Sequence, residues 1–158
     1  MWGWFQKSFA LVFLLIVFST MIVSLTDKQI PASFLGTKEI SSPSDWVKED
    51  QIKVYEDKVV LEINNTIWAS FTNTNSMDPF LDEDSHALEI IPQDENEINI
   101  GDIISYQTAY GVVIHRVIEK DVDEKGMYYL VKGDNNLFKD PFKVRFDEIK
   151  GVVVAIIY

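Results

Sequence analysis

GVVIHRVI, at residues 111–118, is a run of mostly β-branched side chains in which strict alternation places His115 on one face with Val113 and Val117. Other short β-branched or aromatic runs follow residue 51: IKVYE (52–56), KVVLEI (58–63), TIWASF (66–71), HALEII (86–91), DIISYQ (102–107), MYYLVK (127–132) and GVVVAII (151–157). Turn-like clusters such as QDENE, DEKG and GDNN separate them. The pattern predicts a mainly antiparallel β domain over residues 51–158, with one short helical turn over residues 144–149.

The N-terminal part of the chain has a different character. Residues 8–25, SFALVFLLIVFSTMIVSL, carry no charge, and at 1.5 Å per helical residue they nearly cross a hydrocarbon core of about 30 Å. We predict a transmembrane anchor here, after a short tail at residues 1–7. A cleaved secretory signal is the alternative, although the run is long for one and lacks a good A-x-A exit.

The anchor also predicts orientation. Lys7 precedes the span and an acid-rich remainder follows it, which favours a cytoplasmic N-terminus and an extracytoplasmic domain. Residues 26–50 contain two prolines, a glycine and several serines without sustained periodicity, so we expect a linker or juxtamembrane segment. Trp46 is its candidate contact with the rest of the chain.

Composition excludes several classes of function. The 14 Lys and Arg residues against 25 Asp and Glu residues give a formal charge of −11, which repels phosphate backbones and argues against nucleic-acid binding. The absence of cysteine excludes a disulfide, a thiolate nucleophile and a thiolate zinc site. Acidic stretches at residues 82–84 and 94–97 are expected to be solvated loops, with weak metal binding as the alternative, and we expect no cofactor.

Three segments contain residues that could carry chemistry, and each also has an ordinary structural interpretation. His115 could be a hydrogen-bonded core histidine. Ser76, in FTNTNSMDP after a predicted strand, could be one more loop serine, or a hydroxyl exposed where backbone N–H groups converge. Asp134 and Asp140, in KGDNNLFKDP, could be turn or capping residues. Taken singly, each segment favours the structural interpretation.

Read in order, these segments resemble signal peptidase I of the archaeal and endoplasmic-reticulum type, over roughly residues 68–158. The family's boxes appear as Ser76-Met77-Asp78-Pro79, Gly101-Asp102-Ile103-Ile104, Ile114-His115-Arg116-Val117, Lys132-Gly133-Asp134-Asn135-Asn136 with Asp140, and Ile149-Lys150-Gly151-Val152. Any one of these short matches could arise by chance. Five in the family's order, after a hydrophobic span, are much more specific.

The resemblance implies a serine endopeptidase that removes signal peptides from secretory preproteins at the lipid bilayer. It makes Ser76 the nucleophile and His115 the general base, in the place that lysine holds in the bacterial branch. Asp134 and Asp140 match the family's two aspartates. We rank Asp140 ahead as the acid that orients His115, because Asp134 lies inside the turn motif GDNN and has a structural role there. Met77 and Pro79 are expected to contact substrate.

The resemblance also implies a coiled, partly closed β domain, and it leaves open whether accessory subunits are needed. One departure is clear, because 50 residues, Thr26 to Asn75, separate the span from the serine, which the family places soon after its anchor. Two alternatives remain: a Ser/Lys-type processing protease with Lys120 or Lys132 as base, and a non-catalytic membrane-tethered β module for interactions.

Overall fold

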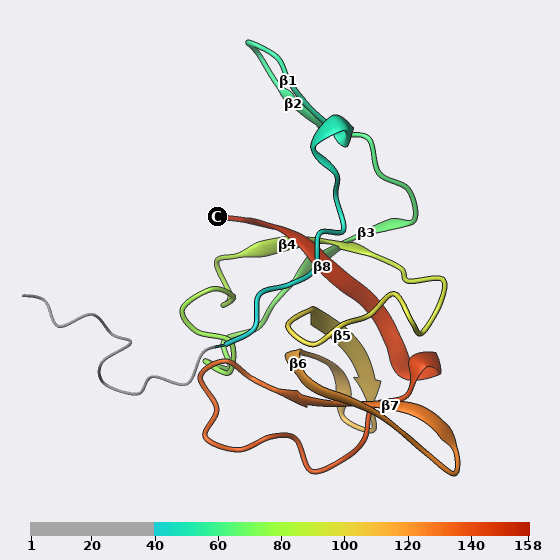
Figure 1. Ribbon diagram of the computed structural model, residues 1–158. Helices are drawn as coiled ribbons and strands as arrows, with labels where there is room; N and C mark the ends of the chain where they lie inside the picture. Colours follow the sequence, from blue (N-terminus) through green and yellow to red (C-terminus); the bar gives the residue numbers. More distant parts are fainter. Residues whose placement is uncertain (1–39) are drawn as a thin grey trace, which may run out of the picture. The chain divides into compact units, whose positions relative to one another are not determined.

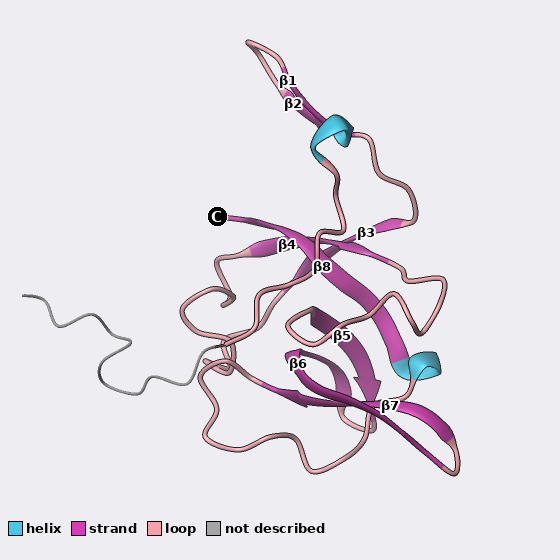
Figure 2. Cartoon of the chain, viewed as in Figure 1, coloured by secondary structure: helices cyan, strands magenta, loops and turns pink. Residues whose placement is uncertain are grey.

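The computed structural model describes residues 40–158, and this part of the chain is mainly β (Figure 1). Its strands are β1 (Ile52–Val54), β2 (Val59–Leu61), β3 (Thr66–Ser70), β4 (His86–Ile90), β5 (Ile103–Thr108), β6 (Gly111–Asp123), β7 (Gly126–Lys132) and β8 (Ile149–Ile157). Two 3-10 turns, Glu49–Gln51 and Phe146–Glu148, are its helical segments (Figure 2). The prediction of a mainly β domain is confirmed, and the second turn lies within the predicted residues 144–149.

Six strands form one antiparallel sheet in the order β3-β4-β8-β5-β6-β7, while β1 and β2 pair separately as a small hairpin. The last strand of the chain, β8, therefore lies between β4 and β5. This insertion brings together strands that are far apart in the sequence, because β8 pairs with β4 through Leu88↔Ala155 and with β5 through Ile104↔Val152.

The sheet is open, which corrects the expectation of partial closure as far as strand pairing within residues 40–158 is concerned. Its outer strands are β3 and β7, and no pairing joins them. In addition, β7 pairs with β6 only from Arg116↔Lys132 onward, because the chain leaves β7 at Lys132 and enters a long loop. Residues 111–115 of β6 are thus left with a free edge on that side.

Apolar side chains are buried on both faces of the sheet, which explains the continuous burial at the start of β5. Ile104 belongs to a cluster with Tyr106, Val117 and Tyr129, whereas its neighbour Ile103 belongs to a second cluster on the other face. Each aliphatic side chain of this size contributes about 1.5–3 kcal/mol when it is removed from water. The two clusters together fix the strands that carry the candidate site.

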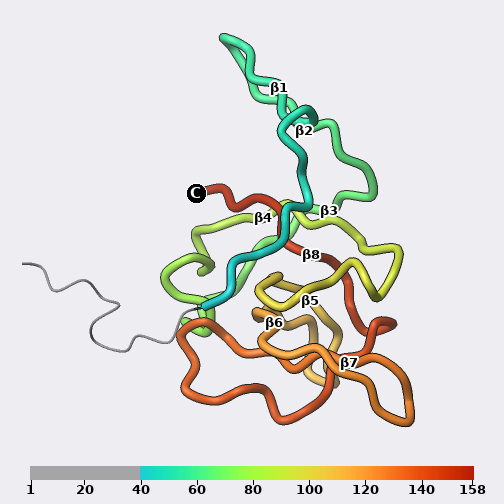
Figure 3. Tube along the Cα trace, in the orientation of Figure 1, coloured from blue at the N-terminus to red at the C-terminus, as the bar shows by residue number. Residues whose placement is uncertain are grey.

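Residues 40–48 lie against the domain rather than forming a free linker over that stretch (Figure 3). The Asp102 carboxylate accepts hydrogen bonds from the Ser44 backbone N–H at 2.6 Å and from Trp46 Nε1 at 3.1 Å. Gly101, with φ +104°, leaves the space in which Ser42 passes, since a Cβ there would lie 2.1 Å from the Ser42 carbonyl oxygen. Trp46 is therefore a contact with the domain, and Gly101 and Asp102 have structural roles.

No helix within residues 40–158 has the length and apolar character to cross a membrane. The predicted anchor at residues 8–25, the tail before it and the first part of the predicted linker lie outside the described residues. The anchor accordingly stays a prediction from the sequence.

Candidate active site

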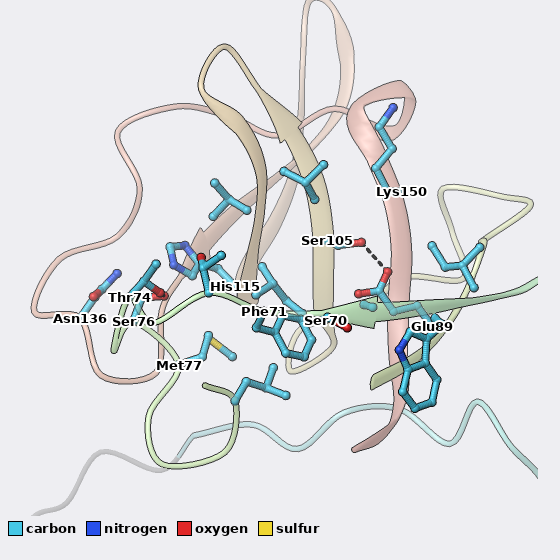
Figure 4. Close-up of a pocket in the computed structure, with 18 residues that line it drawn as sticks. Ser70, Phe71, Thr74, Ser76, Met77, Glu89, Ser105, His115, Asn136 and Lys150 are labelled. Carbon is cyan, nitrogen blue, oxygen red and sulfur yellow. Dashed lines mark hydrogen bonds between the residues drawn. The ribbon is translucent and has the colours of Figure 1, made fainter. Parts of the chain in front are cut away.

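A cavity of about 560 Å³ opens beside β3, β5 and β6, and its walls are mainly apolar. Ser76 and His115 both line it (Figure 4). The other lining residues come from the segment 67–74, from Met77 and Leu81, from Val112 to Ile114 on the free edge of β6, and from Glu89, Ser105, Asn136 and Lys150. Two of the residues that the sequence singled out, 39 positions apart, are thereby brought to one cavity.

Ser76 is held by the turn at residues 133–136. The Asn135 backbone N–H donates to the Ser76 carbonyl oxygen at 3.0 Å, and the Asn135 amide donates to the Asn75 carbonyl oxygen at 2.9 Å. Gly133 permits this approach, because a Cβ there would lie 2.5 Å from the Ser76 carbonyl oxygen. Asn75 has φ +56°, a conformation that asparagine tolerates better than most residues. The turn signal GDNN thus has a specific task, which is to position the serine.

The Ser76 side chain has one hydrogen bond to another described residue. Its Oγ lies 3.2 Å from the Oγ1 of Thr74, which also lines the cavity. The Ser76 backbone N–H makes no backbone hydrogen bond within residues 40–158 and remains free to donate. A hydroxyl, a second hydroxyl and a free N–H therefore meet at one place.

His115 is paired with Asp140. Its Nδ1 lies 2.9 Å from Asp140 Oδ2, and the two side chains are only 8% and 11% exposed. The Asp140 backbone N–H donates to the Val131 carbonyl oxygen at 2.9 Å, which fixes the carboxylate at the end of β7. Because Asp140 accepts from Nδ1–H, the imidazole is held in the tautomer that leaves Nε2 as an acceptor. Nε2 itself has no hydrogen bond to another described residue.

Tyr106 completes this arrangement, and sequence reasoning missed it. The Tyr106 hydroxyl donates a short hydrogen bond to Asp140 Oδ2 and lies 3.4 Å from His115 Nδ1. The residue is fully buried, and burial, with the hydrogen bond to Asp140, raises the pKa of the phenol far above its ordinary value. Tyr106 therefore stays protonated and acts as a permanent donor to the carboxylate.

Asp134 is directed to a different partner. Arg116 Nε donates to Asp134 Oδ1 at 2.8 Å and Nη2 donates to Oδ2 at 2.6 Å, while Nη1 donates to the Gly101 carbonyl oxygen at 2.8 Å. Both side chains are less than 10% exposed. A bidentate pair of this kind fixes geometry and directs the Asp134 carboxylate to Arg116, whereas the carboxylate partner of His115 is Asp140.

The two residues expected to contact substrate differ in their surroundings. Met77 lines the cavity and is 1% exposed, with its Sδ accepting the Asp134 backbone N–H at 3.4 Å. Pro79 is exposed and is not among the lining residues.

A second serine–histidine pair exists in the described chain. Ser70 Oγ lies 3.2 Å from His86 Nδ1, as expected for cross-strand neighbours on β3 and β4. His86 stacks on Trp68, and no described carboxylate contacts its ring nitrogens. This pair lacks the orienting acid that His115 has.

Neither lysine of the Ser/Lys alternative lines the cavity. Lys120 Nζ donates to the carbonyl oxygens of Asn96 and Ile98, at 3.2 and 2.7 Å, which directs it away from the serine. Lys132 lies at the end of β7, opposite Arg116.

Comparisons with protein-family models, with curated proteins and with solved structures found no match to this chain.

Proposed function

We propose that this chain is a membrane-anchored serine endopeptidase of the signal peptidase I type, which removes signal peptides from secretory preproteins. Ser76 is the nucleophile, His115 the general base and Asp140 the acid that orients His115. The observation that carries the proposal is that Ser76 shares one cavity with a histidine whose Nδ1 is hydrogen-bonded to a nearly buried carboxylate. That is the arrangement which activates a serine hydroxyl in acyl transfer.

In the first step, His115 Nε2 accepts the Ser76 proton while Oγ attacks the carbonyl carbon of the scissile peptide bond. Asp140 stabilises the imidazolium that forms, and Tyr106 holds Asp140 by its hydrogen bond. The imidazolium then returns the proton to the leaving amine, and water hydrolyses the acyl-enzyme with the same histidine as base. This general acid–base step contributes typically 10²- to 10⁴-fold in rate.

The oxyanion of the tetrahedral intermediate needs donors beside Ser76. The Ser76 backbone N–H, which makes no backbone hydrogen bond within residues 40–158, is the first. The Thr74 hydroxyl is the second, because it lies 3.2 Å from the attacking oxygen and faces the same cavity. In the substrate-free structure the Ser76 hydroxyl is bonded to Thr74 rather than to His115. Catalytic hydrogen bonds often tighten only when substrate is bound.

The mainly apolar walls suit a peptide of signal-sequence character. An extended substrate can add to the free edge of β6 at residues 111–115, which lines the cavity and has no strand partner on that side among the described residues. We place the domain on the extracytoplasmic face, held at the bilayer by the anchor predicted at residues 8–25.

Cleavage of a model preprotein by the detergent-solubilised full chain tests the proposal. Wild type should cut after a small residue, and Ser76→Ala and His115→Ala should lose cleavage while remaining folded. His86→Ala, which removes the other serine–histidine pair at a residue that does not line the cavity, should retain it. If Ser76→Ala cuts as well as wild type, or if the folded wild type cuts nothing, the chain is better described as a tethered interaction module.

A further inference from the structure

The cavity has a second polar feature, formed by Glu89 and Ser105. Both residues are almost fully buried, at 1% and 4% exposure, and both line the cavity. Ser105 Oγ donates to Glu89 Oε2 at 2.6 Å, as the dashed line in Figure 4 marks. In that view they lie at the far side of the cavity from Ser76 and His115.

The two side chains come from strands that are not neighbours. Glu89 is on β4 and Ser105 is on β5, with β8 between them, so the glutamate must reach across β8. It does so over Gly151, where a Cβ would lie 2.5 Å from Glu89 Oε2 and 2.7 Å from Glu89 Cβ. Only glycine leaves that passage open.

The backbone of β8 is also irregular on both sides of this crossing. Its pairing with β5 shifts register between Ser105 and Tyr106, and its pairing with β4 shifts between Leu88 and Glu89. Bulges of this kind redirect side chains and are common beside active sites. The glycine and the two shifts together direct the carboxyl group of Glu89 to Ser105 and the cavity.

Fold stability does not explain this carboxyl group. Glu89 Oε1 is buried and has no hydrogen-bond partner among the described residues, and no described lysine or arginine forms an ion pair with Glu89. Burial raises the pKa of Glu89, and the hydrogen bond from Ser105 opposes that rise only in part. A buried polar atom without a partner destabilises a protein and calls for an explanation.

We propose that Glu89 and Ser105 form a specificity subsite that binds the amine of a substrate side chain, as on lysine, at a position away from the scissile bond. Ser105 already donates to one carboxylate oxygen, so the other needs a donor, and an ammonium group supplies both that donor and the compensating charge. Ile67 and Ile114, which line the same cavity, provide apolar surface for the methylene stem. The assignment to a protease substrate rests on the proposed function, but binding of the amine does not.

Peptide binding to full-length Ser76→Ala in detergent tests the subsite without requiring catalysis. The probes are alanine-based peptides that carry one lysine, glutamine or norleucine at successive positions, with affinity measured by fluorescence anisotropy. At one position lysine should bind roughly tenfold tighter than norleucine, as expected for a buried charge-assisted hydrogen bond. Adding Glu89→Gln should abolish that preference, whereas Glu62→Gln, which neutralises an exposed carboxylate on the chain segment after β2, should not.

The outcomes separate the two proposals. If the peptides show a lysine preference that depends on Glu89, but the wild-type chain cuts no preprotein, the subsite proposal stands and the protease proposal fails. If wild type cuts the preprotein but no position shows a lysine preference, or if the preference survives Glu89→Gln, the subsite proposal fails and the protease proposal stands. A preference for glutamine equal to that for lysine shows that a neutral donor suffices, and the amine assignment fails.

If no peptide binds measurably, n-butylammonium decides the question. In protein with ¹³C-labelled glutamate carboxyl groups, millimolar n-butylammonium should move the Glu89 resonance and lower the pKa of Glu89. The same concentration of n-butanol should leave both unchanged. An unperturbed Glu89 resonance would overturn the subsite.

Discussion

His115 and Arg116 are neighbours on β6, and each is paired with an aspartate of the loop that follows β7, yet the two pairs differ in what they can do. Arg116 and Asp134 share two parallel hydrogen bonds, and a third joins Arg116 to the Gly101 carbonyl oxygen. His115 and Asp140 share a single carboxylate oxygen, and the other imidazole nitrogen is left without a described partner.

The difference lies in the proton chemistry of the basic partner. Arginine is always charged, so the Arg116–Asp134 pair holds the loop in place and has no proton to exchange. Histidine gains and loses a proton near neutral pH, so a carboxylate paired with it, as Asp140 is with His115, can orient a base and stabilise its protonated form. Two aspartates six residues apart, both nearly buried, therefore have different roles. Substituting each aspartate in turn should separate the catalytic role from the structural one.

The largest effect is expected from Asp140→Asn. An amide cannot stabilise the imidazolium and can hold His115 in the wrong tautomer, so kcat should fall by roughly 10²- to 10⁴-fold. The thermal midpoint should change little, since Tyr106 can still donate to the asparagine oxygen. Single-turnover cleavage of a model preprotein, alongside a thermal melt, measures both. Equal activity in wild type and Asp140→Asn would show that the comparison assigns the wrong aspartate.

Asp134→Asn should act on stability instead. It leaves the Arg116 charge buried without a counterion, which costs about 3–5 kcal/mol in the free energy of unfolding. Urea denaturation followed by tryptophan fluorescence gives the loss, and cleavage per folded molecule should fall far less than in Asp140→Asn. The double variant Arg116→Met/Asp134→Leu removes both charges and should recover much of the stability. A stable Asp134→Asn that has lost its activity would contradict this division.

The strands could be predicted because alternation and turn signals are local properties. Gly111 follows a two-residue turn, and the alternation around His115 sets its face correctly. The order of the strands in the sheet could not be predicted, since the sequence GVVVAII carries no local signal that β8 pairs with β4 and β5. For the same reason the Glu89–Ser105 pair, which exists only through that insertion, is invisible in the sequence.

The site could be predicted in part. Ordered motifs singled out Ser76, His115 and Asp140, and the pairing of Asp134 with Arg116 agrees with the structural role predicted for Asp134. Tyr106 was missed although a signal exists, because the two-residue connection between Thr108 and Gly111 fixes the register of β5 and β6 and puts Tyr106 on the face of His115. Thr74 had no such signal, since the conformation of its loop depends on distant contacts at residues 133–136.

Tyr106→Phe tests the His115–Asp140 pair further, and its expected effect on kcat is smaller than that of Asp140→Asn. It removes one of the two donors to Asp140 Oδ2 and should lower kcat roughly tenfold, in line with the loss of a hydrogen bond to a charged group. Tyr129→Phe is the matched control, because that buried hydroxyl donates to the Glu95 carbonyl oxygen and lies outside the cavity. It should lower stability without changing kcat. If both variants lower kcat equally, Tyr106 has no specific positioning role.

The smallest effect concerns a third buried carboxyl group, Glu89, which has neither an arginine nor a histidine as partner among the described residues. Burial raises the pKa of Glu89 in the folded state, so the protonated form stabilises the fold below the ordinary glutamate range, and this contribution is lost as pH rises through the raised folded pKa. Glu89→Gln should remove that loss. Its stability relative to wild type should therefore increase from pH 5 to pH 8 in urea denaturation. A relative stability of Glu89→Gln that is flat or falling over this range would mean that Glu89 is already charged in the folded protein, and that its second oxygen has found a donor.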